Sequence, residues 1–501
     1  MHSNQRTRLL VILSLLLSLA IWPSCARASS ASESVATSQS DKLPITTKSE
    51  EAKKEFLAGR DLSERLLAHD SVAHFDKAIA LDPDFASAEL ARANNAPTAK
   101  EFFEHQQKAV ALADKVSEGE KLFILANQAG ANGKPAEQKQ YLDKLAADYP
   151  NDERVQFNLG GYYFGQQDYS QALEHYKKAT EIAPDYSPAY NLLGYSYRQE
   201  GDYAGAEQAF KKYVELIPGD PNPYDSYGEL LLKMGRFDDS IAQYRKALSI
   251  DPHFNASHFG IAADLLYQGK AVAAAQELQA MAVAARNDGE RRTAFFGMAV
   301  VAADIGKLDQ ALKAMDKEYA VAEKKNDIAA MAADLQAKGN ILSEMQRYDA
   351  AAQQFDRSAQ MIASSNLSQQ VKANADLLHR FNLVALAIAR KDLSGAKTQA
   401  ESFQQAADAS QNPAQVKQAH ELNGRIALAE KDFDKAITEL EQANQQNPKN
   451  LFRLSQAYQA KGDSAKAQEY LKKAAEFHSL PNLNYAFVRS KAQKATRNTK
   501  A

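Results

Sequence analysis

Residues 153–186 read ERVQFNLGGYYFGQQDYSQALEHYKKATEIAPDY, and the pattern of this stretch returns along the chain every 34 residues. Four classes of residue keep the same period. The copies are Gly160, Gly194 and Gly228; Ala172, Ala206 and Ser240; Tyr176, Phe210 and Tyr244; and Pro150, Pro184, Pro218 and Pro252. A fixed period of this length is typical of a protein built from stacked, repeated structural units.

Each unit predicts two helices. Leu159 and Gly160 fall on one face of a first helix, and Ala172 and Tyr176 fall on one face of a second. The small residues at 160 and 172 are expected where the two helices cross, because a larger side chain there would separate the backbones. Pro184 ends the second helix, since its ring cannot continue the helical backbone. One hairpin cannot bury its apolar face alone, so the units should stack into an all-α solenoid.

The set Leu159-Gly160, Tyr163, Ala172, Tyr176, Ala179 and Pro184 resembles the tetratricopeptide repeat (TPR) family. This resemblance implies a right-handed α-solenoid of eleven to twelve helical hairpins. We expect an N-terminal array in strict phase at residues 49–288 and an irregular array at 289–481, in which extra residues lengthen the helices. A terminal helix with a basic tail is expected at 482–501.

The N-terminus has the layout of a secretory signal peptide, which we place at residues 1–28. Its parts are Arg6 and Arg8, the apolar run Leu9–Ile21, and the small-residue cleavage site Ala26-Arg27-Ala28. The alternatives are a retained membrane anchor and a lipoprotein attached through Cys25, the only cysteine. Residues 29–48 are rich in Ser and Thr, which predicts a disordered leader. The chain is therefore expected to be exported, to the periplasm or the cell envelope.

Composition and motifs argue against catalysis and against nucleic-acid binding. The 501 residues carry a formal net charge of −3, which provides no positive field for nucleic acid. There is no G-x-S-x-G motif and no phosphate-binding loop, and the string that opens at His420-Glu421 has Gly424 where a zinc protease has its second histidine. We predict a protein that is not an enzyme and needs no cofactor or metal.

The resemblance implies that the first helix of each unit lines a concave face that binds peptides or helices of other proteins. Carried over by repeat phase, the predicted partner-binding residues are Arg154, Phe157, Phe164, Asn191, Tyr195, Arg198, Gln199, Asp225, Glu229, Lys233, Phe259 and Tyr267. Aromatic rings beside separated charges suit a peptide groove. The alternative is that the aromatic residues pack between units and the polar residues only face solvent.

The resulting hypothesis is an exported, non-catalytic scaffold that binds other proteins through its concave face. The alternative is a structural subunit or assembly factor of a bacterial envelope machine for outer-membrane assembly, pilus biogenesis or polysaccharide export. Residues 486–501 contain five basic residues and no acid, which predicts weak association with an anionic envelope surface or merely a solubilising terminus.

Overall fold

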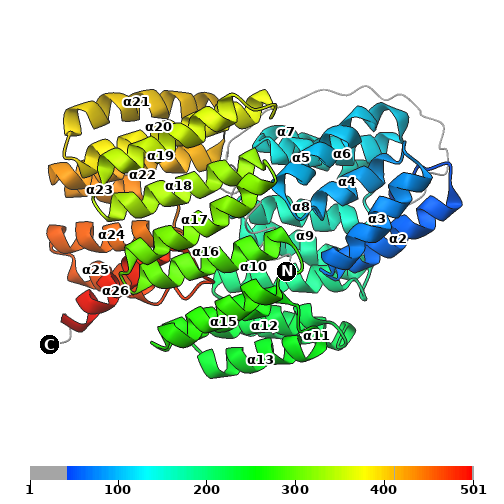
Figure 1. Cartoon of the computed structure of the whole chain (residues 1–501), viewed down its shortest axis with the longest axis horizontal. Coiled ribbons are helices and arrows are strands. Elements are labelled where there is room, and N and C mark those ends of the chain that lie inside the picture. The colour runs from blue at the N-terminus through cyan, green and yellow to red at the C-terminus, as the bar shows by residue number, and fades with distance from the viewer. Residues whose placement is uncertain (1–41, 411, 499–501) are drawn as a thin grey trace, which may run out of the picture.

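The computed structural model of the chain describes residues 42–410 and 412–498, and every regular element in these ranges is a helix (Figure 1). In chain order these are α2 (Glu50–Glu64), α3 (Ala68–Leu81), α4 (Ala86–Asn94), α5 (Ala99–Ala111), the short 3₁₀-helix η1 (Ala113–Lys115), α6 (Glu118–Ala131), α7 (Pro135–Asp148), α8 (Glu153–Gly165), α9 (Tyr169–Ile182), α10 (Ser187–Glu200), α11 (Tyr203–Leu216), α12 (Pro221–Lys233), α13 (Phe237–Ile250), α14 (Asn255–Tyr267), α15 (Ala271–Ala284), α16 (Asp288–Asp304), α17 (Leu308–Lys324), α18 (Ile328–Glu344), α19 (Tyr348–Ala363), α20 (Gln369–Ala389), α21 (Leu393–Ser410), α22 (Pro413–Glu430), α23 (Phe433–Gln442), α24 (Pro448–Lys461), α25 (Ser464–Ala475) and α26 (Leu483–Asn498). The expected signal peptide, Cys25 and residues 29–41 of the leader lie outside the described residues.

Successive helices pair into twelve hairpins, from α2 with α3 to α24 with α25, and α26 follows the last hairpin. This arrangement confirms the predicted all-α solenoid of stacked hairpins. Helices α8 to α15 contain 13 or 14 residues each. Helices α16 to α22 contain 16 to 21 residues. The looser register after residue 288 therefore reflects longer helices, as predicted.

The repeated glycine and the repeated aromatic residue meet within the hairpins that carry both of them. A Cβ atom added at Gly160 would lie 2.5 Å from Cε1 of Tyr176, and one added at Gly194 would lie 2.7 Å from Cε1 of Phe210. Tyr176 and Phe210 are fully buried. The absence of a side chain on the first helix thus makes room for the ring on the second, which explains why both residue types keep the period of 34.

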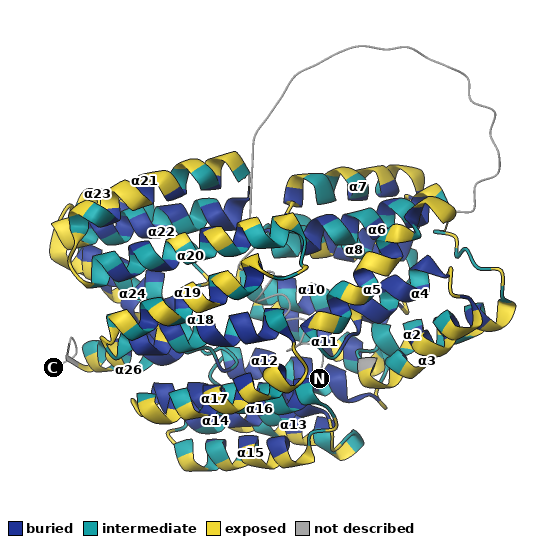
Figure 2. Ribbon diagram, turned by 45° about the horizontal axis from the view of Figure 1, so that its top comes forward, coloured by how far each residue is buried: buried dark blue, intermediate teal, exposed yellow. Residues whose placement is uncertain are grey.

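The first helix of a hairpin is more enclosed than the second. In α12, 10 of 13 residues are buried, whereas only three of 14 are buried in α13. Figure 2 shows the exposed residues gathered along the outer sides of second helices such as α7, α15 and α21. The first helices therefore form the inside of the solenoid.

The solenoid turns back on itself, so that the third hairpin contacts the tenth and eleventh. The Ser368 hydroxyl donates to Oδ1 of Asn132 (2.8 Å), and Nδ2 of Asn374 donates to the Asn132 carbonyl (3.0 Å). Nδ2 of Asn412 donates to the Gly133 carbonyl (3.1 Å). Asn132 and Gly133 lie in the turn between α6 and α7, and these bonds hold that turn against the start of α20 and α22.

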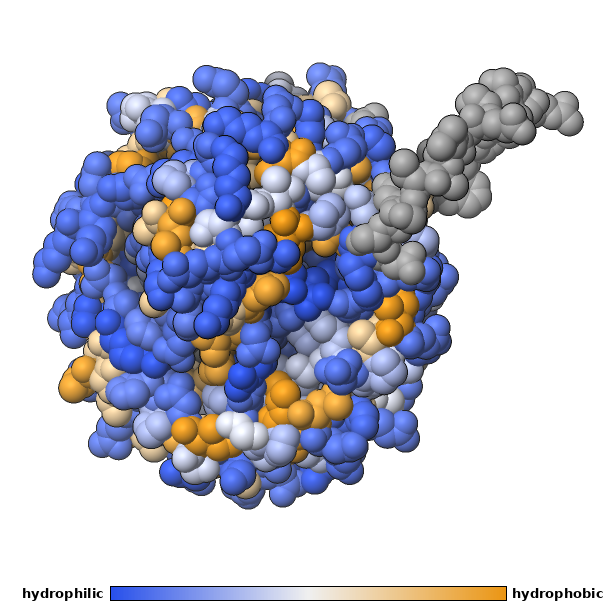
Figure 3. All heavy atoms as spheres, turned by 90° about the vertical axis from the view of Figure 1, so that its right-hand side faces the viewer, coloured by the Kyte–Doolittle hydropathy of each residue, from blue (hydrophilic) through white to orange (hydrophobic). Residues whose placement is uncertain are grey.

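The surface carries no large apolar area on the side drawn in Figure 3, where hydrophobic side chains lie in small separate patches. Within the described ranges, no helix has both the length and the apolar character needed to cross a membrane.

Candidate protein-binding face

Helices α8, α10, α12, α14 and α16 contact one another in this order, each as the first helix of its hairpin. We call the side of these helices that faces the interior of the solenoid the inner face. All twelve predicted partner-binding residues lie on α8, α10, α12 and α14. The structure places them in several groups with different surroundings.

The first group joins α10 to α12. Nη1 of Arg198 lies 3.2 Å from Oε2 of Glu229, and the Arg198 guanidinium lies 4.6 Å from the centre of the Tyr195 ring. The Tyr195 hydroxyl donates to Oγ of Ser226 (3.3 Å). Repeat phase placed these three residues on one face, and the structure brings Tyr195, Arg198 and Glu229 together.

Beside this group lie two buried acceptors that lack a donor. Asp225 is 1% exposed, and its Oδ1 accepts from the Ser257 hydroxyl at 2.7 Å. Among the described residues, nothing donates to Oδ2 of Asp225 or to Oδ1 of Asn191. Burial, with a further contribution from the Glu229 charge, raises the pKa of Asp225 to about 7.

The three phenylalanines of the predicted set pack inside the solenoid. Each contacts its own or the neighbouring hairpin: Phe157 with Tyr176 and Tyr186, Phe164 with Tyr169, and Phe259 with Leu278. This packing favours the alternative that these aromatic residues pack between units rather than bind a partner. Gln199 is half-buried at the end of α10.

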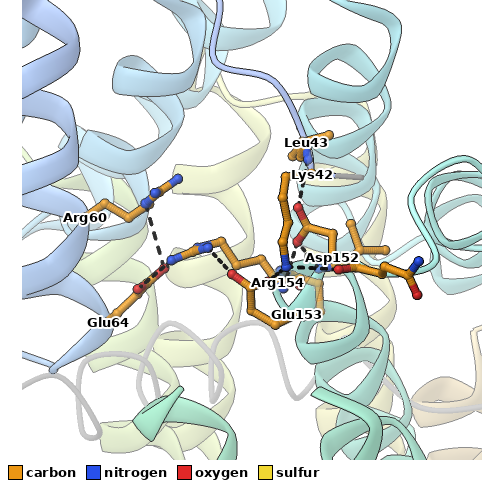
Figure 4. A network of polar contacts seen from close by, with 10 residues as sticks. Lys42, Leu43, Arg60, Glu64, Asp152, Glu153 and Arg154 are labelled. Carbon is orange, nitrogen blue, oxygen red and sulfur yellow. Dashed lines mark hydrogen bonds and ion pairs between the residues drawn. The ribbon is translucent and has the colours of Figure 1, made fainter. Parts of the chain in front are cut away.

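Arg154 belongs to an ion-pair network that links α8 to the first hairpin (Figure 4). Its Nε lies 2.7 Å from Oε1 of Glu64 on α2, and its Nη1 pairs with Glu153. Lys42 also pairs with Glu153. The guanidinium lies 5.3 Å from the Tyr186 ring centre. Arg154 is thus engaged within the chain rather than directed toward an open groove.

Residues 42–48, which we call the N-terminal strap, differ from the disordered leader expected from their composition. Three of their N–H groups donate to carboxylates near the starts of successive first helices: Leu43 to Asp152 (2.7 Å), Thr46 to Glu120 (2.8 Å) and Lys48 to Asp82 (3.1 Å). Acids at hairpin junctions supply the acceptors, and this explains why a polar segment is ordered here. Composition alone could not reveal the spacing of those acids in space.

Replacing Glu120 with Ala is expected to lower the free energy of unfolding by about 3 kcal/mol. Glu120 is 2% exposed and accepts from Thr46, from the Ser87 hydroxyl (2.8 Å) and from the Ser117 hydroxyl (2.8 Å) in a capping box. Urea unfolding followed by circular dichroism measures the change. Glu137→Ala is the control, since Glu137 also lies in a first turn but in an exposed ion pair. Equal losses for the two variants would contradict this role of Glu120.

Lys233 and Tyr267 contact residues 477–489, which we call the C-terminal segment. Nζ of Lys233 donates to the Phe477 carbonyl (2.6 Å), and the Tyr267 hydroxyl donates to the Ser479 carbonyl. The sequence predicted a terminal helix, but it did not predict that this helix packs on α16 as well as on α24 and α25, or that the residues before it contact α12 and α14. No repeat signal marks this contact, because it joins hairpins six and seven to a segment that follows the last hairpin.

Lowering the pH through the window from about 6.5 to about 4 is expected to loosen the C-terminal segment. Burial, then the charge of Lys233, lowers the pKa of His478 from 6.5 to about 4. Within this pH window His478 of the released segment is protonated, whereas His478 of the docked segment is not. Docking is therefore most favourable above about pH 6.5 and becomes weaker as the pH falls toward about 4. The titratable and charged groups that surround His478 are Lys233, Tyr267, Tyr485 and Arg489.

Hydrogen exchange of residues 477–489, corrected for intrinsic rates, measures this loosening. His478→Phe is the matched variant, because it keeps an aromatic ring beside Phe237 but cannot bind the proton. Its exchange should vary less with pH across the window. An identical pH profile in the two proteins would contradict the prediction.

The other sequence features that suggested chemistry are engaged structurally. Nδ1 of His420 lies 2.7 Å from Oε2 of Glu439, and Glu421 pairs with Arg453 at 2.9 Å. Within the part of the chain that is described, no three His, Cys, Asp or Glu side chains gather as metal ligands. In the basic tail, Arg489 pairs with Asp304 and Lys491 lies 3.2 Å from Glu344, so acids of the chain already engage two of its cations.

Comparison with solved structures gives matches to parts of the chain. The crystal structure of PilW, described as a widely conserved type IV pilus biogenesis factor, is 21% identical and covers 44% of this chain and 96% of its own, with a TM-score of 0.31. MamA 41-end from Desulfovibrio magneticus RS-1 is 19% identical and covers 33% of this chain and 93% of its own, with a TM-score of 0.29. TM-scores this low carry no functional information. No curated protein sequence matches the chain.

Models of the tetratricopeptide repeat match residues 125–187, 163–230, 222–254 and 427–481. The matched residues lie in both the regular and the irregular part of the solenoid. Residues 125–254 and 427–481 of the chain are therefore tetratricopeptide repeats.

Proposed function

We propose that the chain is an exported scaffold that acts in the periplasm or at the envelope and binds a segment of another protein on its inner face, at α10 and α12. The observation that carries the proposal is the pair of buried acceptors, Asn191 Oδ1 and Asp225 Oδ2, that have no donor among the described residues. A buried polar atom without a partner costs about 1–3 kcal/mol, so a partner that supplies donors would recover this free energy.

The surroundings of these acceptors suit the main chain of a bound segment. Asn191 and Asp225 are 5% and 1% exposed, so backbone N–H groups of the partner would reach their free oxygens where α10 and α12 separate locally on binding. Such donors would be recognised whatever the partner's side chains. Tyr195 offers a ring for apolar contact, and the Arg198–Glu229 pair lies next to it. Paired opposite charges at a groove set the direction in which a polar segment binds. Export rests on the sequence of residues 1–28, and N-terminal sequencing of envelope-extracted protein should begin at residue 29.

The test is the charge-swapped double variant Arg198→Glu with Glu229→Arg. The swap keeps an ion pair inside the chain, so helicity and unfolding midpoint should change little. The partner, however, meets both charges reversed, and its capture should fall by about tenfold or more. Tagged full-length chain is used for affinity capture from a cross-linked envelope extract, and the captured proteins are quantified by mass spectrometry.

The matched control is Lys212→Glu with Glu215→Lys on α11, the outer helix of the same hairpin, where Nζ of Lys212 lies 2.7 Å from Oε1 of Glu215. This variant should capture as much partner as the native chain. Equal capture by the inner-face variant would place the binding surface elsewhere. If all three proteins retain the same large, stoichiometric assembly, the alternative of a structural subunit of an envelope machine is favoured.

A further inference from the structure

We infer that the inner face of α12, α14 and α16 recognises a segment with aromatic residues followed by an arginine, and that the chain's own C-terminal segment (residues 477–489) occupies this surface in competition with a partner segment of the same chemistry. The inference rests on the proposed function and extends it, since it adds a second subsite and a control on access to the inner face.

The surface holds the main chain of the segment through side-chain donors. Nζ of Lys233 and the Tyr267 hydroxyl each donate to a backbone carbonyl, of Phe477 and Ser479 respectively. Residues 477–482 lie between α25 and α26 and are not helical, so their carbonyls are available to such donors. Recognition of this kind does not depend on the side chains of the bound segment.

Aromatic contacts define what the surface selects. Nζ of Lys233 lies 4.4 Å from the Phe477 ring centre, and the Tyr267 ring centre lies 5.6 Å from that of Tyr485. His478 stands edge-on to Phe237, with ring centres 5.2 Å apart. An aromatic ring packed beneath a lysine and against a tyrosine gains both apolar and cation–π contact.

An arginine subsite completes the surface on α16. Both Nε and Nη2 of Arg489 donate to the carboxylate of Asp304, and the guanidinium lies 5.2 Å from the Tyr267 ring centre. Asp304 is 5% exposed. A buried carboxylate bound by a two-pronged guanidinium is selective for arginine over lysine.

The position of the segment in the chain makes its displacement feasible. It follows the last hairpin and packs on its neighbours α24 and α25 as well as on α12, α14 and α16 of hairpins six to eight. Release breaks this packing, but it breaks none of the contacts between the two helices of any hairpin. Terminal elements open at lower free energy than the core of a fold, so a competing segment can gain access.

The test uses the full chain and a fluorescent peptide of residues 476–492. Arg489→Glu in the chain removes the ion pair with Asp304 and places two acids together. Hydrogen exchange of residues 477–489 should rise by about tenfold, while that of α8 to α15 stays unchanged. The native-sequence peptide should then bind this variant about tenfold more tightly than it binds the native chain, because its own arginine reaches the freed Asp304.

Two controls reverse a charge of the pair formed by residues 304 and 489, one in the chain and one in the peptide. The chain with both Asp304→Arg and Arg489→Glu should hold its segment as the native chain does and exclude the peptide. A peptide that itself carries Arg489→Glu should not bind the single variant.

Two results would overturn the inference. One is increased exchange of residues 477–489 without peptide binding, because the segment would then be a structural cap. The other is unchanged exchange both in Arg489→Glu and in Arg489→Glu with Phe477→Ala, because the segment would then not be displaceable. Peptide binding requires only the purified chain, so these results are independent of whether the capture experiment finds a partner.

Discussion

Replacing Tyr176 with Ala is expected to lower the free energy of unfolding by about 4 kcal/mol. Tyr176 is fully buried, fills the space above Gly160 and contacts Phe157 with ring centres 5.7 Å apart. Truncation leaves a cavity at the crossing of α8 and α9, and the rigid helices on either side can close it only in part. Urea unfolding followed by circular dichroism measures the loss, and hydrogen exchange should locate it in α8, α9 and α10.

Tyr176→Phe is the control that separates the ring from its hydroxyl. Among the described residues, nothing hydrogen-bonds to the Tyr176 hydroxyl, so its burial brings no compensating bond. The same repeat position holds phenylalanine in other hairpins, as Phe75 and Phe210. The Phe variant should therefore be neutral or more stable by up to about 1 kcal/mol. A loss in the Phe variant as large as that in the Ala variant would contradict the assignment of stability to ring packing.

The hairpins could be predicted because their decisive contacts are local in sequence. Gly160 and Tyr176 are 16 residues apart, and their counterparts recur with the period. Each such contact leaves a signal that is repeated along the chain. The longer helices after residue 288 also leave a signal, since the small residue that opens the second helix recurs at wider spacing.

Contacts between distant hairpins could not be predicted in the same way. Whether Asn412 meets Gly133 depends on the pitch of the solenoid, which sums a small rotation over many hairpins. A small error in that rotation, added up over many hairpins, changes which hairpins meet. The N-terminal strap and the C-terminal segment depend on this accumulated geometry too, so composition suggested a disordered leader for one and a free basic tail for part of the other.

The predicted binding residues illustrate the same limit. Repeat phase placed Arg198 and Glu229 on one face, but it could not tell that they pair with each other at 3.2 Å. It also could not separate Phe157, which packs between Tyr176 and Tyr186, from a ring that is free to contact a partner. The inner positions of a solenoid are packing positions and binding positions at once, and only the neighbouring hairpins decide between the two.

Replacing Glu421 with Leu is expected to lower the free energy of unfolding by about 4 kcal/mol at neutral pH. Glu421 is 7% exposed on α22, accepts from Nη1 of Arg453 (2.9 Å) and Nδ2 of Asn450 (3.0 Å), and lies 3.7 Å from Nη1 of Arg425. Without the carboxylate, two guanidinium groups face each other in a buried site. Burial, with the repulsion of Arg453, already lowers the pKa of Arg425 to about 10. Urea unfolding at constant ionic strength measures the effect.

A second substitution distinguishes loss of charge balance from loss of packing. Adding Arg453→Met to Glu421→Leu removes one of the opposed cations, so the double variant should be more stable than the single one although it departs further from the native sequence. A double variant less stable than Glu421→Leu alone would show that packing, not charge, dominates.

The pH dependence of the native chain gives an independent check of the same cluster. Burial acts to raise the pKa of Glu421, but Arg453 and Arg425 outweigh it and hold that pKa below its ordinary value of 4.5. The unfolded chain therefore binds a proton at this residue at a higher pH than the native chain does. The stabilisation is fully present above about 4.5 and is lost as the pH falls through the lower native pKa. The difference in stability between the native chain and Glu421→Leu should accordingly shrink only in that acidic range, and a difference that stays constant there would mean that the carboxylate's charge is not what stabilises α22 against α24.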